Sequence, residues 1–199
     1  MEILIVAGFL GSGKTTLVLS TIERIVERTD KKVAIIVNDF GTIGIDSKVM
    51  EKFGLKVSEL DGGCICCSLG TDLLSTIQIL EENMNPDIVV IEPTGLADPD
   101  AIVHAMKHYP GNTPQRILSF VIIDVVRFPS VFKALSRPLS SQIRTADVIL
   151  MNKIDAISSE MLASVEADIR SIDDSASIIA VSALNDINID KVVDRIVNS

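Results

Sequence analysis

The chain has 199 residues, 47% of them hydrophobic, and a formal net charge of −9. This length suffices for one domain with a full core, and the negative charge argues against a nucleic-acid-binding surface. No apolar run has the length of a membrane-spanning helix. We therefore expect a soluble, cytoplasmic protein that binds neither nucleic acid nor membrane.

A phosphate-binding loop follows the first predicted strand, residues 2–7. Residues 8–15 read Gly-Phe-Leu-Gly-Ser-Gly-Lys-Thr, and the predicted helix 14–28 completes the strand–loop–helix context that this motif requires. Glycines let backbone N–H groups surround phosphates, the lysine adds a full charge, and the threonine hydroxyl can bind Mg²⁺. The predicted nucleotide-binding residues are Gly8, Gly11, Ser12, Gly13, Lys14, Thr15 and Thr16.

The chain continues with a predicted strand 33–38, a switch over 38–46 and a short strand 55–60. All three cysteines follow, as Cys64, Cys66 and Cys67, between glycines that indicate a loop before a helix near 70–82. Thiolates favour Zn²⁺, Cu⁺ or iron over magnesium, so we predict a transition-metal site. A tetrahedral ion would lack one ligand, which water, Glu59, Asp61, a partner subunit or a client could supply. Incidental thiols in a structural loop, or a redox switch, are the alternatives.

An acidic residue ends the next predicted strand, 87–91. Glu92 is followed three positions later by Gly95. In phosphate-loop enzymes an acid at this strand end holds Mg²⁺ directly or through water, and the glycine N–H can sense the γ-phosphate. A switch and a helix are predicted over 95–108, with the helix over Pro99–His108. It carries His104 and His108 at i, i+4 spacing, for which a solvated helix face is the favoured interpretation.

A guanine-reading motif is predicted near the carboxyl end of the chain. After strand 117–123, helices near 128–145 and strand 147–151, the chain reads Asn152-Lys153-Ile154-Asp155. The Asp155 carboxylate can accept hydrogen bonds from guanine N1–H and the 2-amino group, a donor pair that adenine lacks. Asn152 would brace the loop, and the Lys153 stem would lie over the base. After helix 158–171 and strand 177–181, the last base-contacting loop is predicted at Ser182, Ala183 and Leu184, before helix 188–197.

Strands and helices alternate along the whole chain, which predicts an α/β fold with a mostly parallel sheet and helices on both faces. Pro129 and Pro138 are placed to begin helical segments. Asp124 ends a predicted strand at the same sheet edge as the motifs, where a functional role and a loop cap are equally compatible with the sequence.

Five motifs in this order resemble those of the GTPase domain of CobW-like metallochaperones. They are Gly-Phe-Leu-Gly-Ser-Gly-Lys-Thr-Thr, Asn38-Asp39-Phe40-Gly41, Gly-Gly-Cys-Ile-Cys-Cys, Glu-Pro-Thr-Gly-Leu-Ala-Asp-Pro and Asn-Lys-Ile-Asp. The wider superfamily includes the urease and hydrogenase accessory G proteins. The resemblance covers residues 3 to about 197. It implies a three-layer P-loop NTPase fold, GTP and GDP as ligands with Mg²⁺, and metal capture and delivery controlled by GTP, with the cysteine segment as metal site.

Two departures from the family pattern matter. The first switch usually reads Asn-Glu, whereas this chain has Asn38-Asp39. CobW-like proteins usually carry a second domain, whereas this chain ends at Ser199, so we expect a single GTPase domain over 1–199. In that respect it resembles the accessory G proteins that dimerise around metal, which predicts a homodimer that a metal ion could bridge, and a client metalloenzyme or apo-protein.

The predicted activity is slow GTP hydrolysis. Lys14, Asp39, Glu92 and Gly95 are the candidate catalytic residues, with Thr15, Asp39 and Glu92 near Mg²⁺. No arginine finger is evident in cis, and Arg116, Arg127 and Arg144 are unranked candidates. Zinc is favoured at the cysteines, with cobalt, nickel and iron open. The alternatives are a GTP-dependent chaperone that loads cobalamin into a client enzyme, and a redox-sensitive switch protein.

Overall fold

The computed structural model describes residues 1–37, 56–59 and 71–198 of the chain. Asp39, Cys64, Cys66 and Cys67 lie outside the described residues, as do Glu59's side chain and Asp61. The metal-site prediction and the first-switch prediction therefore stay predictions.

The described part of the chain contains a seven-stranded sheet in the order β3-β2-β4-β1-β5-β6-β7, in which every neighbouring pair is parallel. The sheet confirms the predicted α/β fold. Its central strands are runs of β-branched and aliphatic residues, as expected where both faces of a parallel sheet are covered. The strands are β1 (Glu2–Ala7), β2 (Val33–Val37), β3 (Lys56–Glu59), β4 (Ile88–Glu92), β5 (Arg116–Asp124), β6 (Val148–Asn152) and β7 (Ser177–Val181).

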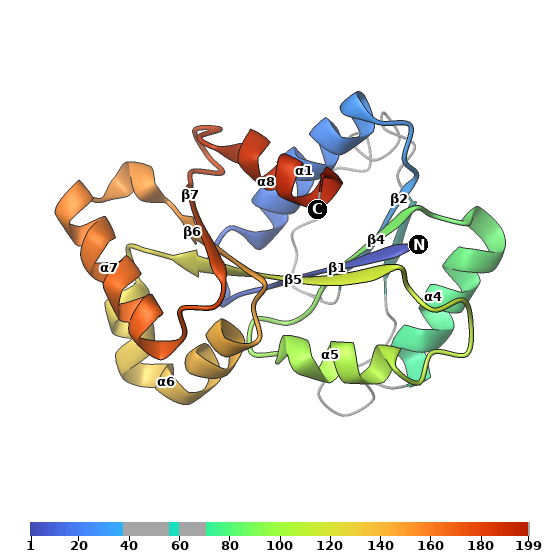
Figure 1. Cartoon of the computed structure of the whole chain (residues 1–199), viewed down its shortest axis with the longest axis horizontal. Helices are drawn as coiled ribbons and strands as arrows, with labels where there is room; N and C mark the ends of the chain where they lie inside the picture. Colours follow the sequence, from blue (N-terminus) through green and yellow to red (C-terminus); the bar gives the residue numbers. More distant parts are fainter. Residues whose placement is uncertain (38–55, 60–70, 199) are drawn as a thin grey trace.

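Helices cover both faces of this sheet (Figure 1). On one face lie α1 (Lys14–Arg28) and α8 (Ile189–Val197), which share one apolar cluster with the sheet. On the other face lie α4 (Thr71–Met84), α5 (Pro99–Met106), α6 (Phe128–Arg144) and α7 (Ser159–Ile172). A single 3-10 turn, η1 (Ile154–Ala156), follows β6.

The core divides along the alternation of side chains in each strand. In β1, Leu4 and Val6 pack toward α1 and α8, whereas Ile3 and Ile5 pack toward α4 and α5. Successive side chains of a strand point to opposite faces, so a strand between two helix layers must be apolar at every position. This explains why β1 reads as a continuous apolar run.

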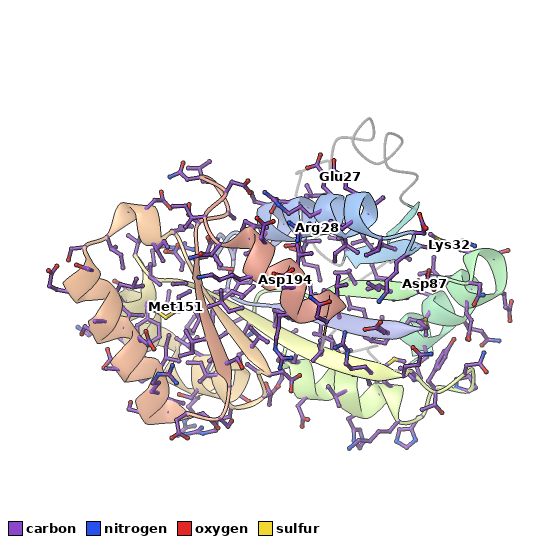
Figure 2. The ribbon with its side chains drawn as sticks, turned by 45° about the horizontal axis from the view of Figure 1, so that its top comes forward. Glu27, Arg28, Lys32, Asp87, Met151 and Asp194 are labelled. Carbon is purple, nitrogen blue, oxygen red and sulfur yellow. The ribbon has the colours of Figure 1, made fainter. Side chains whose placement is uncertain are left out.

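Ion pairs join α1 to α8 on the outside of the molecule. Arg24 contacts Asp186 and Asp190, and Arg28 contacts Asp190. Arg28 also contacts Asp194 at 3.4 Å, and both residues are labelled in Figure 2. The aspartates are largely exposed, so each pair contributes about 0–1 kcal/mol. The pairs add to the apolar contacts that hold α8 against the helix that begins at the phosphate loop.

Two helices show how caps and prolines set helix boundaries. Helix α5 begins at Pro99, as predicted, because the Asp98 carboxylate accepts a hydrogen bond from the Asp100 N–H and forms an N-cap before a proline in the first turn. The helix ends at Met106, two residues before the predicted end. Helix α6 is kinked at Leu135, which has φ −134° and ψ 41°. Pro138 lies just beyond, in the first turn of the second segment, in agreement with its predicted place at a helix start.

Among the described residues, we find no helix with the length and apolar character needed to cross a membrane.

Candidate nucleotide site

Three strands end side by side where the motifs lie. Asp124, the last residue of β5, is in register with Asn152, the last residue of β6, and Asn152 is in register with Val181 of β7. On the other side of β1, Glu92 ends β4. Because carboxyl ends of parallel strands share one edge, the predicted phosphate, magnesium and base motifs meet there.

The phosphate loop uses glycine where no other residue fits. Gly8 has φ +139°, and a Cβ there would lie 2.3 Å from the Ile122 carbonyl oxygen. Gly13 has φ +96°, and a Cβ there would lie 2.3 Å from the Asn152 side-chain nitrogen. Both positions combine a left-handed backbone with close approach of neighbouring atoms. The loop is therefore held tightly between β5 and the end of β6.

Lys14 begins α1 directly after this loop. Its side chain is only 5% exposed, and its Nζ donates a hydrogen bond to the Phe9 carbonyl oxygen at 3.4 Å. The ammonium group therefore lies over the loop at a helix N-terminus, where a lysine and backbone N–H groups together favour an anion. Thr16, the other predicted residue in this turn, is exposed.

Glu92 faces the same helix start from the end of β4. The Thr15 Oγ1 donates a hydrogen bond to Glu92 Oε1 at 2.9 Å, and Glu92 is 2% exposed. A hydroxyl and a carboxylate are hard oxygen donors of the kind that Mg²⁺ prefers. The pair is thus chemically suited to hold a magnesium ion, directly or through water, beside the phosphate loop.

Asn152 joins three loops through one buried side chain. Its Nδ2 donates to the Ser12 carbonyl oxygen at 2.8 Å, while its Oδ1 accepts from the N–H groups of Lys153 at 2.9 Å and Ala183 at 3.0 Å. The residue is 2% exposed. The phosphate loop and the two loops predicted to contact the base therefore have a fixed relation to one another.

A carboxylate with two cations supports the outer side of the phosphate loop. Asp124 Oδ2 accepts from Arg127 Nε at 2.7 Å and from Lys153 Nζ at 2.8 Å. Both cations also donate to loop carbonyls, Arg127 to Leu10 and Lys153 to Gly11, each at 2.7 Å. Because these two carbonyl oxygens are held away from the inside of the loop, the N–H groups of the loop can point toward a bound phosphate.

Asp124 is therefore both a loop cap and an ion-pair centre. Its Oδ1 accepts from the N–H groups of Val126 and Arg127 at 3.0 and 3.2 Å. Burial raises the pKa of this carboxyl, but the hydrogen bonds from Lys153 and Arg127 outweigh that effect and leave the pKa below its ordinary value. The group is thus an anion at neutral pH.

The segment after Glu92 is packed against the phosphate loop and held by α6. A Cβ on Gly95 would lie 2.8 Å from the Leu10 backbone nitrogen. The Gln142 side chain, 1% exposed, donates to the carbonyl oxygens of Gly95 at 3.2 Å and Ala97 at 2.8 Å. The residue predicted to sense the γ-phosphate therefore touches both the phosphate loop and α6.

The other predicted base-site residues lie at the same edge. Asp155 is exposed within η1, and Ser182 is buried, with its Oγ accepting from the Asn185 N–H at 3.1 Å. Leu184 is 83% exposed. Of the three arginine candidates, Arg127 touches the phosphate loop, whereas Arg116 pairs with Glu2 at the far end of β1.

Two residues that support the site were not predicted from the sequence, Gln142 and Ser141. The Ser141 Oγ donates to the Asp98 carboxylate at 2.6 Å. One signal was available for Gln142, which is polar and stands between the buried Leu139 and Ile143 on the inner face of an amphipathic helix. A buried amide at such a place needs a partner. Nothing in the sequence indicated that the partners lie in the segment 95–97.

The predicted cysteine site cannot be placed on this edge, because the cysteines lie outside the described residues. Within the described part, no three or more His, Cys, Asp and Glu side chains are grouped so as to hold a metal ion. His104 lies on α5, and His108 lies in the turn that follows the end of α5 at Met106. Both side chains are exposed, in agreement with the solvated-face interpretation, and their ring centroids are 5.4 Å apart.

Comparison with known proteins agrees with this geometry. Zinc chaperone YeiR of Escherichia coli is 33% identical over 158 residues, which cover 78% of this chain and 47% of that protein. Zinc-regulated GTPase metalloprotein activator 1 of Schizosaccharomyces pombe is 31% identical over 188 residues, covering 90% of this chain and 45% of that protein. This chain spans about half the length of these curated relatives.

The fold is similar to that of a solved structure, hydrogenase maturation factor HypB from Archaeoglobus fulgidus. The TM-score is 0.72 at 23% identity, over 98% of this chain and 88% of that one. The family model described as CobW/HypB/UreG, nucleotide-binding domain, matches residues 2–180. The chain therefore belongs to the family of CobW/HypB/UreG nucleotide-binding domains.

Proposed function

We propose that this chain binds GTP with Mg²⁺ and hydrolyses GTP slowly to GDP and phosphate. Its nucleotide state is coupled to the binding and delivery of a transition metal, and zinc is the favoured metal. The observation that carries the proposal is the Asn152 side chain, which hydrogen-bonds the phosphate loop, Lys153 and Ala183 at once. A site built this way suits a ligand that has phosphates at one end and a base at the other.

Guanine selectivity follows from the carboxylate of Asp155. It stands in η1, directly after the residue that joins the loops. Its two oxygens can accept from guanine N1–H and the 2-amino group, while an adenine would leave the carboxylate without these donors. Ser182, Ala183 and Leu184 would border the base from the neighbouring strand end. We therefore expect GTP and GDP to bind far more tightly than ATP.

The residues of the phosphate end have separate tasks. Lys14 would neutralise charge on the outer phosphates as the bond to the γ-phosphoryl group breaks. Thr15, Glu92 and Asp39 would hold Mg²⁺, which supplies further neutralisation of the phosphate oxygens when it is bound. Gly95 would respond to the γ-phosphate through its backbone N–H. The Arg127 side chain already donates hydrogen bonds to the Asp124 carboxylate and to the Leu10 carbonyl oxygen. Because it is held there and not at the γ-phosphate, we expect slow turnover without a partner.

The metal proposal depends on the three cysteines and on the relatives. Both curated relatives described above carry zinc in their names. Cys64, Cys66 and Cys67 provide soft ligands in a segment that lies, in sequence, between the first switch and Glu92. Metal binding and GTP binding should then alter each other's affinity by the same factor. A client apo-protein would receive the metal, and a homodimer could complete the ligand set. Reduced thiols fit a cytoplasmic setting.

The test is a titration of the reduced protein with Zn²⁺ and Co²⁺, with and without GTP and Mg²⁺. Cobalt bound to thiolates gives a charge-transfer band whose intensity reports the number of sulfur ligands. We expect tight binding that changes with nucleotide and that weakens in the Cys66→Ser variant, while GTP affinity stays the same. The Cys66→Ser protein is compared with Ser68→Ala, a neighbour without a thiol. Equal metal affinity in all three proteins would refute the cysteine site.

A further inference from the structure

Helix α6 differs in charge from the rest of the molecule. The chain has 27 acidic and 18 basic residues, yet α6 contains no acidic residue. Its charged side chains are Lys133, Arg137 and Arg144, and all three are exposed. An electrostatically distinct surface on an acidic protein is suited to a partner of the opposite sign.

An open hollow of about 510 Å³ runs along the second segment of this helix. Two guanidinium groups and four hydroxyl-bearing residues line it. We call this surface the α6 hollow; its residues are Ser136, Arg137, Ser140, Ser141, Arg144 and Thr145. Guanidinium groups and hydroxyls are donors to carboxylates, and the guanidinium can bind one in a bidentate manner.

The two arginines differ in the electrostatic interactions that they form within the chain. Arg137 forms no ion pair with any residue that the structure describes. Arg144 lies near Asp173, whose pKa is lowered chiefly by hydrogen bonds from Ser175 and to a smaller extent by the Arg144 charge. The hollow therefore keeps donor capacity that the folded chain does not use.

One wall of the hollow is connected to the nucleotide site. Ser141 lines the hollow, and its Oγ donates at 2.6 Å to Asp98, the residue that caps α5. The next residue, Gln142, points inward and holds the carbonyls of Gly95 and Ala97. Helix α6 thus presents the hollow on its outer side and holds the segment after Glu92 with adjacent residues.

We propose that the α6 hollow binds an acidic segment of a partner protein, and that this binding alters nucleotide affinity through Ser141 and Gln142. Carboxylates of the segment pair with Arg137 and Arg144, and the hydroxyls of Ser136 and Ser140 add hydrogen bonds. The Ser141 hydroxyl already donates to Asp98, and the Thr145 hydroxyl donates to backbone carbonyls. A short acidic segment meets only this local surface, whereas a long polyanion such as nucleic acid would also meet a protein of net charge −9. The coupling to nucleotide rests on the proposed function, but the binding does not.

The experiment uses a fluorescein-labelled oligo-glutamate peptide and the full chain. We expect saturable binding by fluorescence anisotropy that weakens with added salt, with amide shifts in ¹⁵N spectra confined to α6 and its neighbours. The double variant Arg137→Ala/Arg144→Ala should weaken binding at least about tenfold. The control, Lys107→Ala/Lys191→Ala, removes the same charge from two exposed sites elsewhere and should bind as the wild type does.

Three results would overturn the binding proposal. The first is the absence of peptide binding. The second is an equal loss in both double variants, which would mean a response to net charge alone. The third is an oligomer that depends on protein concentration and disappears in the Arg137→Ala/Arg144→Ala variant, because the hollow would then be occupied by a second copy of the chain. Unfolding curves of each variant establish that the protein compared is folded.

The coupling is tested with Ser141→Ala. In the wild type, the peptide should change the affinity for a fluorescent GTP analogue, and GTP should change peptide affinity by the same factor. In Ser141→Ala, the peptide should still bind, but this mutual effect should be lost. Coupling that persists in Ser141→Ala would contradict the connection through this residue. A protein that binds the peptide but no GTP would refute the proposed function, while the proposal that the α6 hollow binds an acidic segment would remain supported.

Discussion

The side-chain nitrogen of Asn152 lies 2.8 Å from the Ser12 carbonyl oxygen. A single hydrogen bond therefore joins the end of β6 to the loop that follows β1. The two residues are separated by most of the chain. Their contact places the two ends of the nucleotide site at a fixed spacing, and the same side chain accepts from the N–H of Ala183. A nucleotide that uses both ends thus meets a preformed frame.

The first prediction concerns these hydrogen bonds of Asn152, which we call the Asn152 joint. Asn152→Ala removes three hydrogen bonds at a buried position, so we expect a loss of about 1–3 kcal/mol in the free energy of unfolding and at least about tenfold weaker GTP binding. Urea unfolding and titration with a fluorescent GTP analogue measure the two effects. Asn185→Ala, at an exposed position of the same loop region, is the control. Unchanged GTP affinity in Asn152→Ala would show that the joint does not govern the site.

The second prediction concerns Glu92. In Glu92→Gln the amide oxygen can still accept from Thr15, so the contact at 2.9 Å is retained while the charge is lost. We expect GTP hydrolysis to fall at least about a hundredfold and to require more Mg²⁺, with Mg²⁺-free nucleotide binding little changed. Because the residue is 2% exposed, removal of its charge should not lower stability.

The check is a Mg²⁺ titration of both the hydrolysis rate and GTP affinity in the wild type and in Glu92→Gln. Glu82→Gln, an exposed residue of α4, serves as the matched control. Identical Mg²⁺ dependence in the wild type and Glu92→Gln would remove this residue from the magnesium site.

The third prediction concerns the contact between Gly95 and the phosphate loop. Gly95→Ala would bring a methyl group to 2.8 Å from the Leu10 backbone nitrogen, so one of the two segments must move. We expect about 1–3 kcal/mol of strain, expressed as weaker GTP binding. Leu96→Ala removes an exposed neighbour, 60% accessible, and should leave GTP affinity near that of the wild type. Equal affinities in both variants would contradict a coupling between these segments.

The sequence was sufficient for the elements that depend on local patterning. Strand β1 and helix α1 have the predicted bounds, because an apolar run, a glycine loop and an amphipathic repeat all indicate the same boundary at Lys14. The start of α5 at Pro99 was also predicted, and Asp98 and Pro99 together form an N-cap with a proline in the first turn. The end of α5 at Met106 comes two residues before the predicted one.

The contacts between distant segments were beyond prediction from the sequence. Gln142 and Gly95 are 47 positions apart, and the pairing depends on how α6 lies on the sheet beside α5. The kink at Leu135 sets the direction of that second segment. A proline indicated where a helical segment starts, but no local rule gives the angle at which the helix then packs. The motifs therefore predicted which segments meet at this edge of the sheet, but not the residues of α6 that hold one of those segments.

The last prediction concerns pH and Asp124. The folded-state pKa of this carboxyl is lowered, because the hydrogen bonds from Lys153 and Arg127 exceed the opposing effect of burial. A carboxyl with a depressed folded pKa stabilises the protein above its unfolded pKa, about 3.9 for aspartate, and this contribution is lost as pH falls through the folded value. In Asp124→Asn the amide oxygen can still cap Val126 and Arg127, but the charge is absent. We therefore expect Asp124→Asn to be less stable by about 1–3 kcal/mol at neutral pH.

That difference should stay constant from neutral pH down to about pH 5 and shrink below about pH 4, as the wild-type carboxyl becomes protonated. Urea unfolding at a series of pH values measures it, with the exposed Asp174→Asn as the control. GTP affinity should also fall in Asp124→Asn, because Arg127 and Lys153 would hold the Leu10 and Gly11 carbonyls without their shared anion. A stability difference that grew on acidification would mean that Asp124 is strained by its burial, and the ion-pair account of the phosphate-loop support would be wrong.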